Sequence, residues 1–287
     1  MRDIPSRTAE YMALFRAVET AGPARTRLFQ DPYAAAFLTG RLKALATLGR
    51  LATCILDLGW PRTRSSAVIR TRLIDDLVRQ AIAAGARQAL LLGAGFDSRP
   101  YRLTELRGVP LFEVDHPATQ QAKLQRLQRR LDPLPPNVRF VPVDFEVDNL
   151  ETALLQAGFA PQLPSVAVWE GVVSYLTPAA VEQNFQILSR ILAPQSRLIF
   201  TYVHKGALDG SVLFPEAARW KSSVRSTGEP FTFGFDPAAL PHYLQPHGFT
   251  LLSDTSTAQA AQSYCPPLHR SEPGSELYRV AAARHQS

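Results

Sequence analysis

The fold is decided by the stretch Ala89-Leu90-Leu91-Leu92-Gly93-Ala94-Gly95-Phe96-Asp97-Ser98-Arg99, an apolar run that ends in two glycines and then becomes polar. A short continuous apolar run bounded by glycine is typical of a parallel strand that is buried on both faces. Glycines at positions 93 and 95 allow the backbone to bend tightly and to approach a ligand without a Cβ atom in the way. The stretch therefore predicts a strand that leads into a ligand-binding turn.

A second apolar run follows about twenty residues later and ends in an acid: Leu111-Phe112-Glu113-Val114-Asp115. A carboxylate at the end of that strand is placed to accept hydrogen bonds from the two hydroxyls of a ribose. The third glycine of the dinucleotide fingerprint is absent, because Ser98 stands in its place. That glycine serves close packing of the helix that faces a pyrophosphate. The pattern therefore favours S-adenosylmethionine, which has no phosphates, over a nicotinamide dinucleotide.

The chain of 287 residues is long enough for one large α/β domain, and 46% of its residues are hydrophobic. Five further strands are expected at 138–145, 165–170, 197–203, 249–253 and 277–283. Strands alternating with helices predict a doubly wound sheet of seven strands. Within a single domain over 1–287, we expect a helical cover at 1–84, a cofactor-binding core at 85–203, an irregular substrate-cover insertion at 204–235, and the last helix and strands at 236–287.

The amino-terminal region has helical patterns. Apolar residues recur at helical spacing between residues 8 and 19, Asp31-Pro32-Tyr33 is typical of a helix start, and a longer helix is expected at about 66–84. This last helix carries Arg70 and Arg72, whose guanidinium groups match a carboxylate in two-pronged geometry. Either arginine is thus a candidate carboxylate clamp or a surface charge.

The net charge is +6, but the basic residues are dispersed and no basic motif with interleaved aromatics occurs, so nucleic acid is not expected as a partner. The densest basic stretch, 123–130, has leucines at helical spacing and is predicted to be the solvated face of a helix. Cys54 and Cys265 are expected as buried thiols, and no metal site is expected. Neither a leader nor a membrane span is recognised, and we expect a soluble cytoplasmic protein.

Ligands of open α/β sheets bind beyond the carboxyl ends of the strands. Glu170 ends the fourth strand, and Tyr175, Tyr202 and His204 follow or end strands at the same predicted edge. Asp144 ends the third strand, where it is placed either to accept from an adenine amino group or to cap the helix expected from Asn149 onward. The proline at 142 indicates an edge strand or an irregular strand end.

Four motifs occur in order along the chain: Leu92-Gly93-Ala94-Gly95-Phe96-Asp97-Ser98-Arg99-Pro100-Tyr101-Arg102-Leu103, Phe112-Glu113-Val114-Asp115-His116-Pro117, Trp169-Glu170-Gly171-Val172-Val173-Ser174-Tyr175-Leu176 and Gly228-Glu229-Pro230-Phe231-Thr232-Phe233-Gly234-Phe235. With the opening Ser6-Arg7-Thr8-Ala9-Glu10-Tyr11, they resemble the bacterial branch of the leucine carboxyl methyltransferase family, a group of class I S-adenosylmethionine-dependent enzymes. The resemblance implies a Rossmann-like sheet whose last strand is antiparallel, with helical additions at the amino end and after the fifth strand.

The resemblance also implies roles for individual residues. Gly93, within the turn Gly93-Ala94-Gly95, would lie against the methionine part of the cofactor, and Asp115 would hold the ribose, with Glu113 sharing or supporting that contact. The remaining implied cofactor contacts are Asp144 and Phe145 at the adenine edge, Arg70 at the methionine carboxylate, Glu170 near the methionine amino group, and either Arg7 or Arg16 at the amino terminus.

In such an enzyme the protein positions an acceptor against an activated methyl group. A carboxylate acceptor is ionised at pH 7 and needs no general base, whereas a hydroxyl needs a proton acceptor, for which Tyr202, His204 and Tyr175 are candidates. We expect O-methylation of a carboxylate or hydroxyl on a small molecule, anionic or hydroxylated. The alternatives are methylation of a protein C-terminus and a non-catalytic cofactor-binding module. The oligomeric state is not predicted.

Overall fold

The computed structural model describes residues 6–145, 147–226 and 230–286. In these residues seven strands form one sheet in the order β3-β2-β1-β4-β5-β7-β6, and β7 runs antiparallel to both of its neighbours. The strands are β1 (Gln88–Leu92), β2 (Leu111–Asp115), β3 (Val138–Pro142), β4 (Ser165–Trp169), β5 (Arg197–Val203), β6 (Phe249–Ser256) and β7 (Tyr278–His285). The predicted seven-stranded α/β sheet is therefore confirmed, as is the antiparallel last strand.

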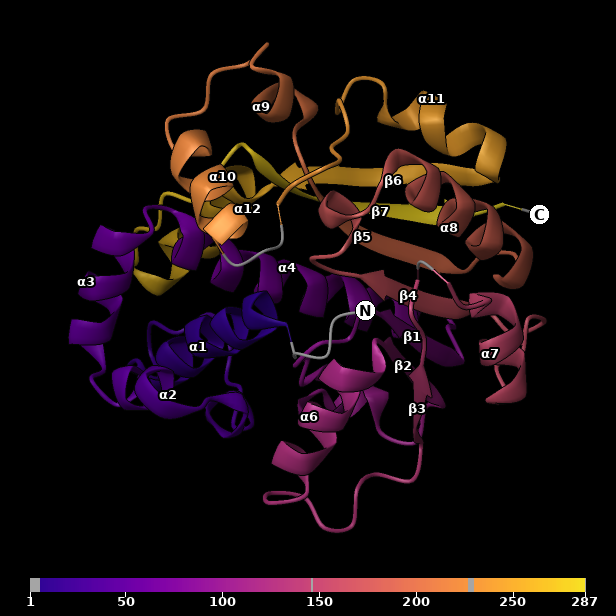
Figure 1. The fold of residues 1–287 in the computed structure, drawn as a ribbon, viewed down its shortest axis with the longest axis horizontal. Coiled ribbons are helices and arrows are strands. Elements are labelled where there is room, and N and C mark those ends of the chain that lie inside the picture. The colour runs from indigo at the N-terminus through magenta and orange to yellow at the C-terminus, as the bar shows by residue number, and fades with distance from the viewer. Residues whose placement is uncertain (1–5, 146, 227–229, 287) are drawn as a thin grey trace.

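Helices cover both faces of the sheet (Figure 1). Their bounds are α1 (Arg7–Ala21), α2 (Gly40–Ala46), α3 (Arg50–Gly59), α4 (Thr63–Ala83), α5 (Arg99–Arg102), α6 (Pro117–Leu127), α7 (Leu150–Gln156), α8 (Pro178–Ile191), α9 (Lys205–Asp209), α10 (Ala217–Ser226), α11 (Leu240–Leu244) and α12 (Thr257–Tyr264). In Figure 1, α1, α2 and α3 gather at one end of the view, with α9 and α10 above them. The N-terminal and insertion segments thus lie on the same side of the molecule.

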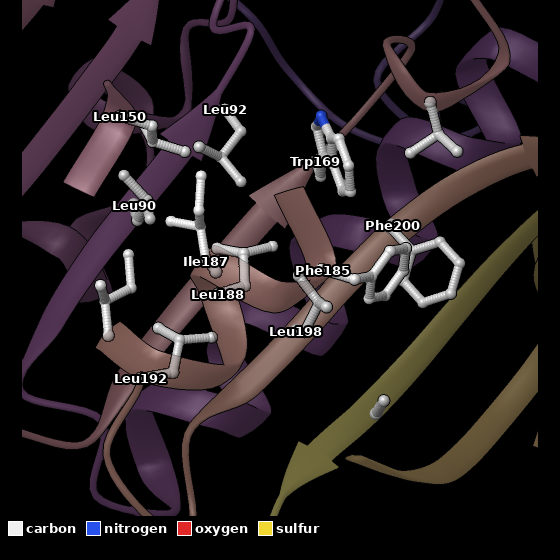
Figure 2. Close-up of a cluster of buried hydrophobic side chains, with 14 of the residues drawn as sticks. Leu90, Leu92, Leu150, Trp169, Phe185, Ile187, Leu188, Leu192, Leu198 and Phe200 are labelled. Carbon is white, nitrogen blue, oxygen red and sulfur yellow. The ribbon is translucent and has the colours of Figure 1, made fainter. Parts of the chain in front are cut away.

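The central strands are buried on both faces, as their continuous apolar runs predict. Along β1, Leu90 and Leu92 join the core formed with α7, α8 and α11, whereas Ala89 and Leu91 join the core formed with α4. This alternation follows from the two-residue repeat of a strand. Figure 2 shows the first of these cores, in which Phe185 of α8 packs between the side chains of β4 and β5. Both cores fix the position of the glycine turn that follows β1.

Several predicted features have different bounds in the structure. Asp31-Pro32-Tyr33 leads into a short 3₁₀ helix at Ala34–Phe37, and the last helix expected after residue 236 is reduced to α11 with a 3₁₀ turn at Gln245–His247. The insertion expected to be irregular contains α9 and α10, and α12 between the last two strands was not predicted. The proline at 142 ends β3, which is an edge strand as predicted.

Two predictions about side-chain exposure are wrong. Lys123 was expected on a solvated helix face, but its side chain is 1% exposed because it turns inward from α6 to Glu113. Cys265 is buried as expected, whereas Cys54 is exposed on α3. Lys123 lies on the face of α6 that also buries Gln120 and Leu127, so its direction follows from helical spacing once that buried face is known.

Candidate functional site

A cavity of about 530 Å³ lies at the carboxyl ends of β1, β2, β3 and β4. Its volume falls within the range of roughly 300–1,000 Å³ that is usual for small-molecule sites. Residues of α1, α4 and α10 close it from the other side. The predicted residues that line it are Arg16, Arg70, Gly93, Ala94, Gly95, Asp115, Asp144, Phe145, Glu170 and Tyr175. The structure thus brings together most of the residues that the motifs single out.

The turn after β1 requires glycine for two reasons. Gly93 and Gly95 have φ angles of +63° and +47°, in the left-handed region that side chains disfavour. A Cβ atom on Gly93 would also collide with the side chain of Val172, which follows β4. Ala94 anchors the turn by donating its N–H to the carbonyl of Val114 at 2.9 Å. The backbone of this turn is therefore held close against the cavity.

Asp115 ends β2 and lies against the glycine turn, at the edge of the cavity. Its carboxylate accepts hydrogen bonds from the N–H groups of Gly95 and, at 2.7 Å, of His116. Burial raises the pKa of this carboxyl, and the two backbone donors oppose the rise. Each carboxylate oxygen has a further lone pair after these bonds, so Asp115 can still accept from a ligand hydroxyl.

Glu170, which follows β4, lies between two arginines. One carboxylate oxygen accepts from Arg70 Nε at 2.7 Å, and the other accepts from Arg99 Nη1 at 2.6 Å. Arg99 also binds Asp97 at 2.6 Å and Asp75 at 2.8 Å, so one guanidinium joins three carboxylates. Its side chain is 3% exposed, which makes it the buried centre of this ion cluster.

The pKa values in the cluster follow from these contacts. Burial alone would raise the pKa of Asp97, but the positive charge of Arg99, helped by more distant cations, holds it at about 2. Burial likewise opposes ionisation of Glu170, and Arg99 and Arg70 outweigh it, so the pKa of Glu170 is lowered. The pKa of Arg99 is raised by the same carboxylates. Asp97, Glu170 and Arg99 are therefore ionised at neutral pH.

The cluster continues beneath the cavity floor. Arg102 binds Asp75 and, through Ser98, contacts Asp31, which in turn pairs with Arg16 at 2.8 Å. Sequence reasoning missed these connections, although Arg99 and Arg102 belong to the first motif. Their spacing on α5 was a usable signal, since residues three apart on a helix lie on one face.

Glu113 does not face the cavity beside Asp115. It is 1% exposed, pairs with Lys123 at 2.6 Å and accepts from the hydroxyl of Tyr101 at 2.7 Å. It is absent from the described lining of the cavity. Glu113 is therefore not placed to share the ribose contact, and a supporting role beside Asp115 stays a prediction. Its partner Lys123 lies close enough to help lower the pKa of Asp97.

Two of the three candidate bases lie outside the described cavity lining. The Tyr202 side chain is fully buried and donates to Asp254 at 2.7 Å, which with burial raises its pKa. His204 begins α9, where its Nδ1 accepts from the N–H of Gly206, and its ring packs on Phe214. Tyr175 is the one of these three candidates that lines the described cavity.

The structure separates the alternative arginines by their positions relative to the cavity. Arg16 lines the cavity and donates to the carbonyl of Phe96 at 2.6 Å, whereas Arg7 is exposed and absent from the described lining. Arg70 lines the cavity, whereas Arg72 is half-exposed and pairs with Asp76. At the third strand, Asn149 caps α7, so Asp144 is not that cap.

Part of the cavity has an aromatic wall, which includes Tyr278 of β7 and Tyr175 after β4. Its six rings are Tyr11, Trp60, Tyr175, Trp220, Phe231 and Tyr278. Tyr278 pairs with Val203, the last residue of β5, so it lies at the same sheet edge as the glycine turn. Part of the fourth motif, Gly228 and Glu229, lies outside the described residues.

This arrangement of sheet and cavity is that of class I methyltransferases. A methyltransferase structure from Thermobifida fusca superposes with a TM-score of 0.62 at 19% identity, over 99% of this chain and 96% of that one. A DUF574 family protein from Streptomyces avermitilis gives 0.60 at 16% identity, over 94% and 96%. At these identities the similarity defines the fold.

The family follows from sequence comparison. The model of the leucine carboxyl methyltransferase family matches residues 9–189. A Streptomyces avermitilis protein assigned as an S-adenosyl-L-methionine-dependent methyltransferase is 34% identical over 95% of this chain and 94% of its own length. A Mycolicibacterium gilvum protein with the same assignment is 30% identical over 96% and 94%. The chain belongs to the leucine carboxyl methyltransferase family.

Among the described residues, no helix is both long and apolar enough to span a bilayer. No cluster of three or more histidine, cysteine or acidic side chains there could hold a metal ion.

Proposed function

We propose that this S-adenosylmethionine-dependent methyltransferase binds its cofactor in the cavity at the carboxyl ends of β1–β4 and methylates an oxygen of a small molecule. The observation that carries the proposal is the meeting of the Gly93–Gly95 turn with the carboxylates of Asp115 and Glu170 around one cavity. We take 85–203 as the cofactor-binding core, with 1–84 and 204–235 as covers and 236–287 completing the domain.

The charges of the lining fit this cofactor. Four carboxylates face the cavity (Asp97, Asp115, Asp144 and Glu170), against two guanidinium groups (Arg16 and Arg70). S-adenosylmethionine carries a sulfonium and an ammonium group against one carboxylate, so it is a net cation. An acidic cavity attracts such a ligand.

Individual residues have separable roles in the proposal. Asp115 accepts hydrogen bonds from the ribose, and Asp144 with Phe145 borders the adenine. Arg70 keeps part of its guanidinium fork for the methionine carboxylate while its Nε holds Glu170. Glu170 accepts from the amino group. Arg16 supports the turn from below through the carbonyl of Phe96.

When bound, S-adenosylmethionine supplies a methyl group that its sulfonium already activates. The protein then has to hold an acceptor oxygen in line and exclude water, and such positioning supplies roughly 7–11 kcal/mol in well-oriented reactions. The buried side chains of Trp220 and Tyr278 line the cavity and help to exclude water from it. Of the three candidate residues, Tyr175 lines the described cavity, where its hydroxyl can orient an acceptor.

Calorimetric titration with S-adenosylhomocysteine tests the cofactor assignment, with NAD titrated in parallel. Micromolar binding of the first and none of the second is expected. Asp115→Ala should weaken that binding by roughly 1.5–3 kcal/mol, the range for hydrogen bonds to charged groups. Asp209→Ala, which removes an exposed acid outside the described cavity lining, is the matched control. Unchanged affinity of a folded Asp115→Ala protein would refute the ribose assignment.

A further inference from the structure

We infer that the acceptor is a neutral aromatic compound methylated on a hydroxyl, and not a carboxylate. The inference rests on the proposed function, because it divides the cavity into a cofactor half and an acceptor half. The cofactor half lies at β1, β2 and β3, with the glycine turn, Asp115 and Asp144. The acceptor half lies toward β5 and β7, where the aromatic wall stands.

The acceptor half is built from rings contributed by separate segments that contact one another. Tyr11 of α1 packs edge-on against Trp60, with centroids 5.4 Å apart. Trp220 of α10 donates its indole N–H to the carbonyl of Pro61 at 3.0 Å and packs on Tyr278. These contacts join the N-terminal cover to the insertion. Their flat, apolar surfaces suit a planar apolar ligand.

A third ring pair completes the wall. Tyr175 packs against Phe231 with centroids 5.4 Å apart. Phe231 belongs to the extended segment after α10, and Thr232 ties that segment to η3 (Val173–Tyr175) by donating its N–H to the carbonyl of Ser174 at 2.8 Å. The wall is thus held from β4, from the insertion and from the start of β7, and it is not a single mobile loop.

The cations of the described lining are already engaged. Arg16 binds Asp31 at 2.8 Å and a backbone carbonyl, and Arg70 binds Glu170 at 2.7 Å. The remaining capacity of Arg70 is assigned to the cofactor carboxylate. The guanidinium carbon of Arg70 also lies 4.8 Å from the centroid of the Tyr278 ring, so that the face of the ring covers the positive charge. An acceptor carboxylate would therefore enter an aromatic half-cavity with no guanidinium left to pair with it, at a large desolvation cost.

A hydroxyl acceptor avoids this cost because it is uncharged on entry. In the transfer, a bond forms between the acceptor oxygen and the methyl carbon while the bond between that carbon and the cofactor sulfur breaks. The sulfur leaves as a neutral thioether, and the hydroxyl proton is released to bulk solvent by way of the Tyr175 hydroxyl, which lines the cavity. The positive charge of the sulfonium is thus carried away by the released proton. In the bound products, the sulfur and the acceptor oxygen are both uncharged.

Three probes with one ring system test the inference on the full chain loaded with S-adenosylhomocysteine: 2-naphthol, 2-naphthoate and protonated 2-naphthylmethylamine. Binding is followed calorimetrically, and methyl transfer is followed with S-adenosylmethionine in place of the homocysteine. We expect 2-naphthol to bind at least tenfold more tightly than either ion and to be methylated. If 2-naphthoate or protonated 2-naphthylmethylamine bound as tightly as 2-naphthol or more tightly, the inference that the acceptor is neutral would be refuted. If none of the three probes bound, the inference that the acceptor is aromatic would be refuted.

A pair of variants locates the binding. Phe231→Ala should weaken 2-naphthol roughly fivefold or more, in line with the loss of a ring contact, and leave S-adenosylhomocysteine affinity unchanged. Phe233→Ala is the control, because Phe233 packs on Phe235 and is absent from the described lining. Loss of cofactor affinity alone in Phe231→Ala would overturn the division of the cavity. Failure of wild-type protein to bind S-adenosylhomocysteine would instead overturn the proposed function, before any probe is added.

Discussion

Arg99 is the residue on which the ion cluster most depends, and its replacement by methionine gives a quantitative test. The guanidinium joins Asp75, Asp97 and Glu170 at 2.6–2.8 Å with 3% of its side chain exposed. Removing one member of a buried ion pair costs about 3–5 kcal/mol, because the partner's charge stays buried without compensation. The lowered pKa of Asp97 alone, about 2 against about 3.9 in an unfolded chain, corresponds to about 2–3 kcal/mol. We therefore expect Arg99→Met to lower the free energy of unfolding by about 3–5 kcal/mol at pH 7.

The pH dependence distinguishes a charge effect from a packing effect. In the native protein, Asp97 and Glu170 have lowered pKa values, so they contribute stability above about pH 4 that is lost as the pH falls toward 2. In Arg99→Met, burial raises their pKa values above those of the unfolded chain, so the folded state takes up protons. The stability of the variant then falls as the pH rises from 4. The difference between the two proteins should be largest at pH 7 and shrink toward pH 4.

Urea unfolding followed by tryptophan fluorescence at pH 7 and at pH 4.5 measures both quantities. Arg79→Met is the matched control, since Arg79 pairs with Asp76 and Glu105 at the surface with 38% of its side chain exposed. Such pairs contribute about 0–1 kcal/mol. A loss below 1 kcal/mol in Arg99→Met, or a loss that is the same at both pH values, would refute the electrostatic account of the cluster.

Three other substitutions separate buried contacts from the cavity wall. Lys123→Met should lower the free energy of unfolding in urea by about 3–5 kcal/mol, because the buried carboxylate partner of Lys123 loses its cation. The control Arg190→Met removes an exposed ion pair and should cost under about 1 kcal/mol. Similar losses in the two variants would contradict this expectation. Gly93→Ala should weaken S-adenosylhomocysteine binding in calorimetry, and Gly108→Ala, with a similar φ in open space, should not. Tyr202→Phe should lower stability by about 1.5–3 kcal/mol and leave cofactor affinity unchanged, and a changed affinity would place Tyr202 in the site after all.

Much of the sheet and of the cofactor edge could be predicted from the sequence because their signals are local. The run at 89–92 is apolar at every position, as a strand covered on both faces requires, and the glycines at 93 and 95 both take positive φ angles. Asp115 and Glu170 end their strands at the edge where ligands of α/β sheets bind. These residues face one cavity as the topology dictates.

The errors arise where side-chain direction depends on partners far away in the sequence. Tyr202 is one residue from the end of β5, but alternation along the strand turns it to the face covered by α8 and α11, away from the cavity. Lys123 looks like one more basic residue on a polar helix, and only the position of Glu113 on β2 explains its burial. Two of the partners of Arg99, Asp75 and Glu170, likewise come from distant segments that meet it only in the folded chain. Such long-range pairs carry no periodicity that the sequence alone reveals.

A crystal structure of the chain with S-adenosylhomocysteine tests the central claim most directly. The account predicts the ribose hydroxyls within hydrogen-bonding distance of the Asp115 carboxylate, the amino acid part between Gly93 and the Arg70–Glu170 pair, and the sulfur directed toward the aromatic wall. A ligand seated elsewhere, or in the same cavity with its adenine against the wall of Trp220 and Tyr278, would contradict it.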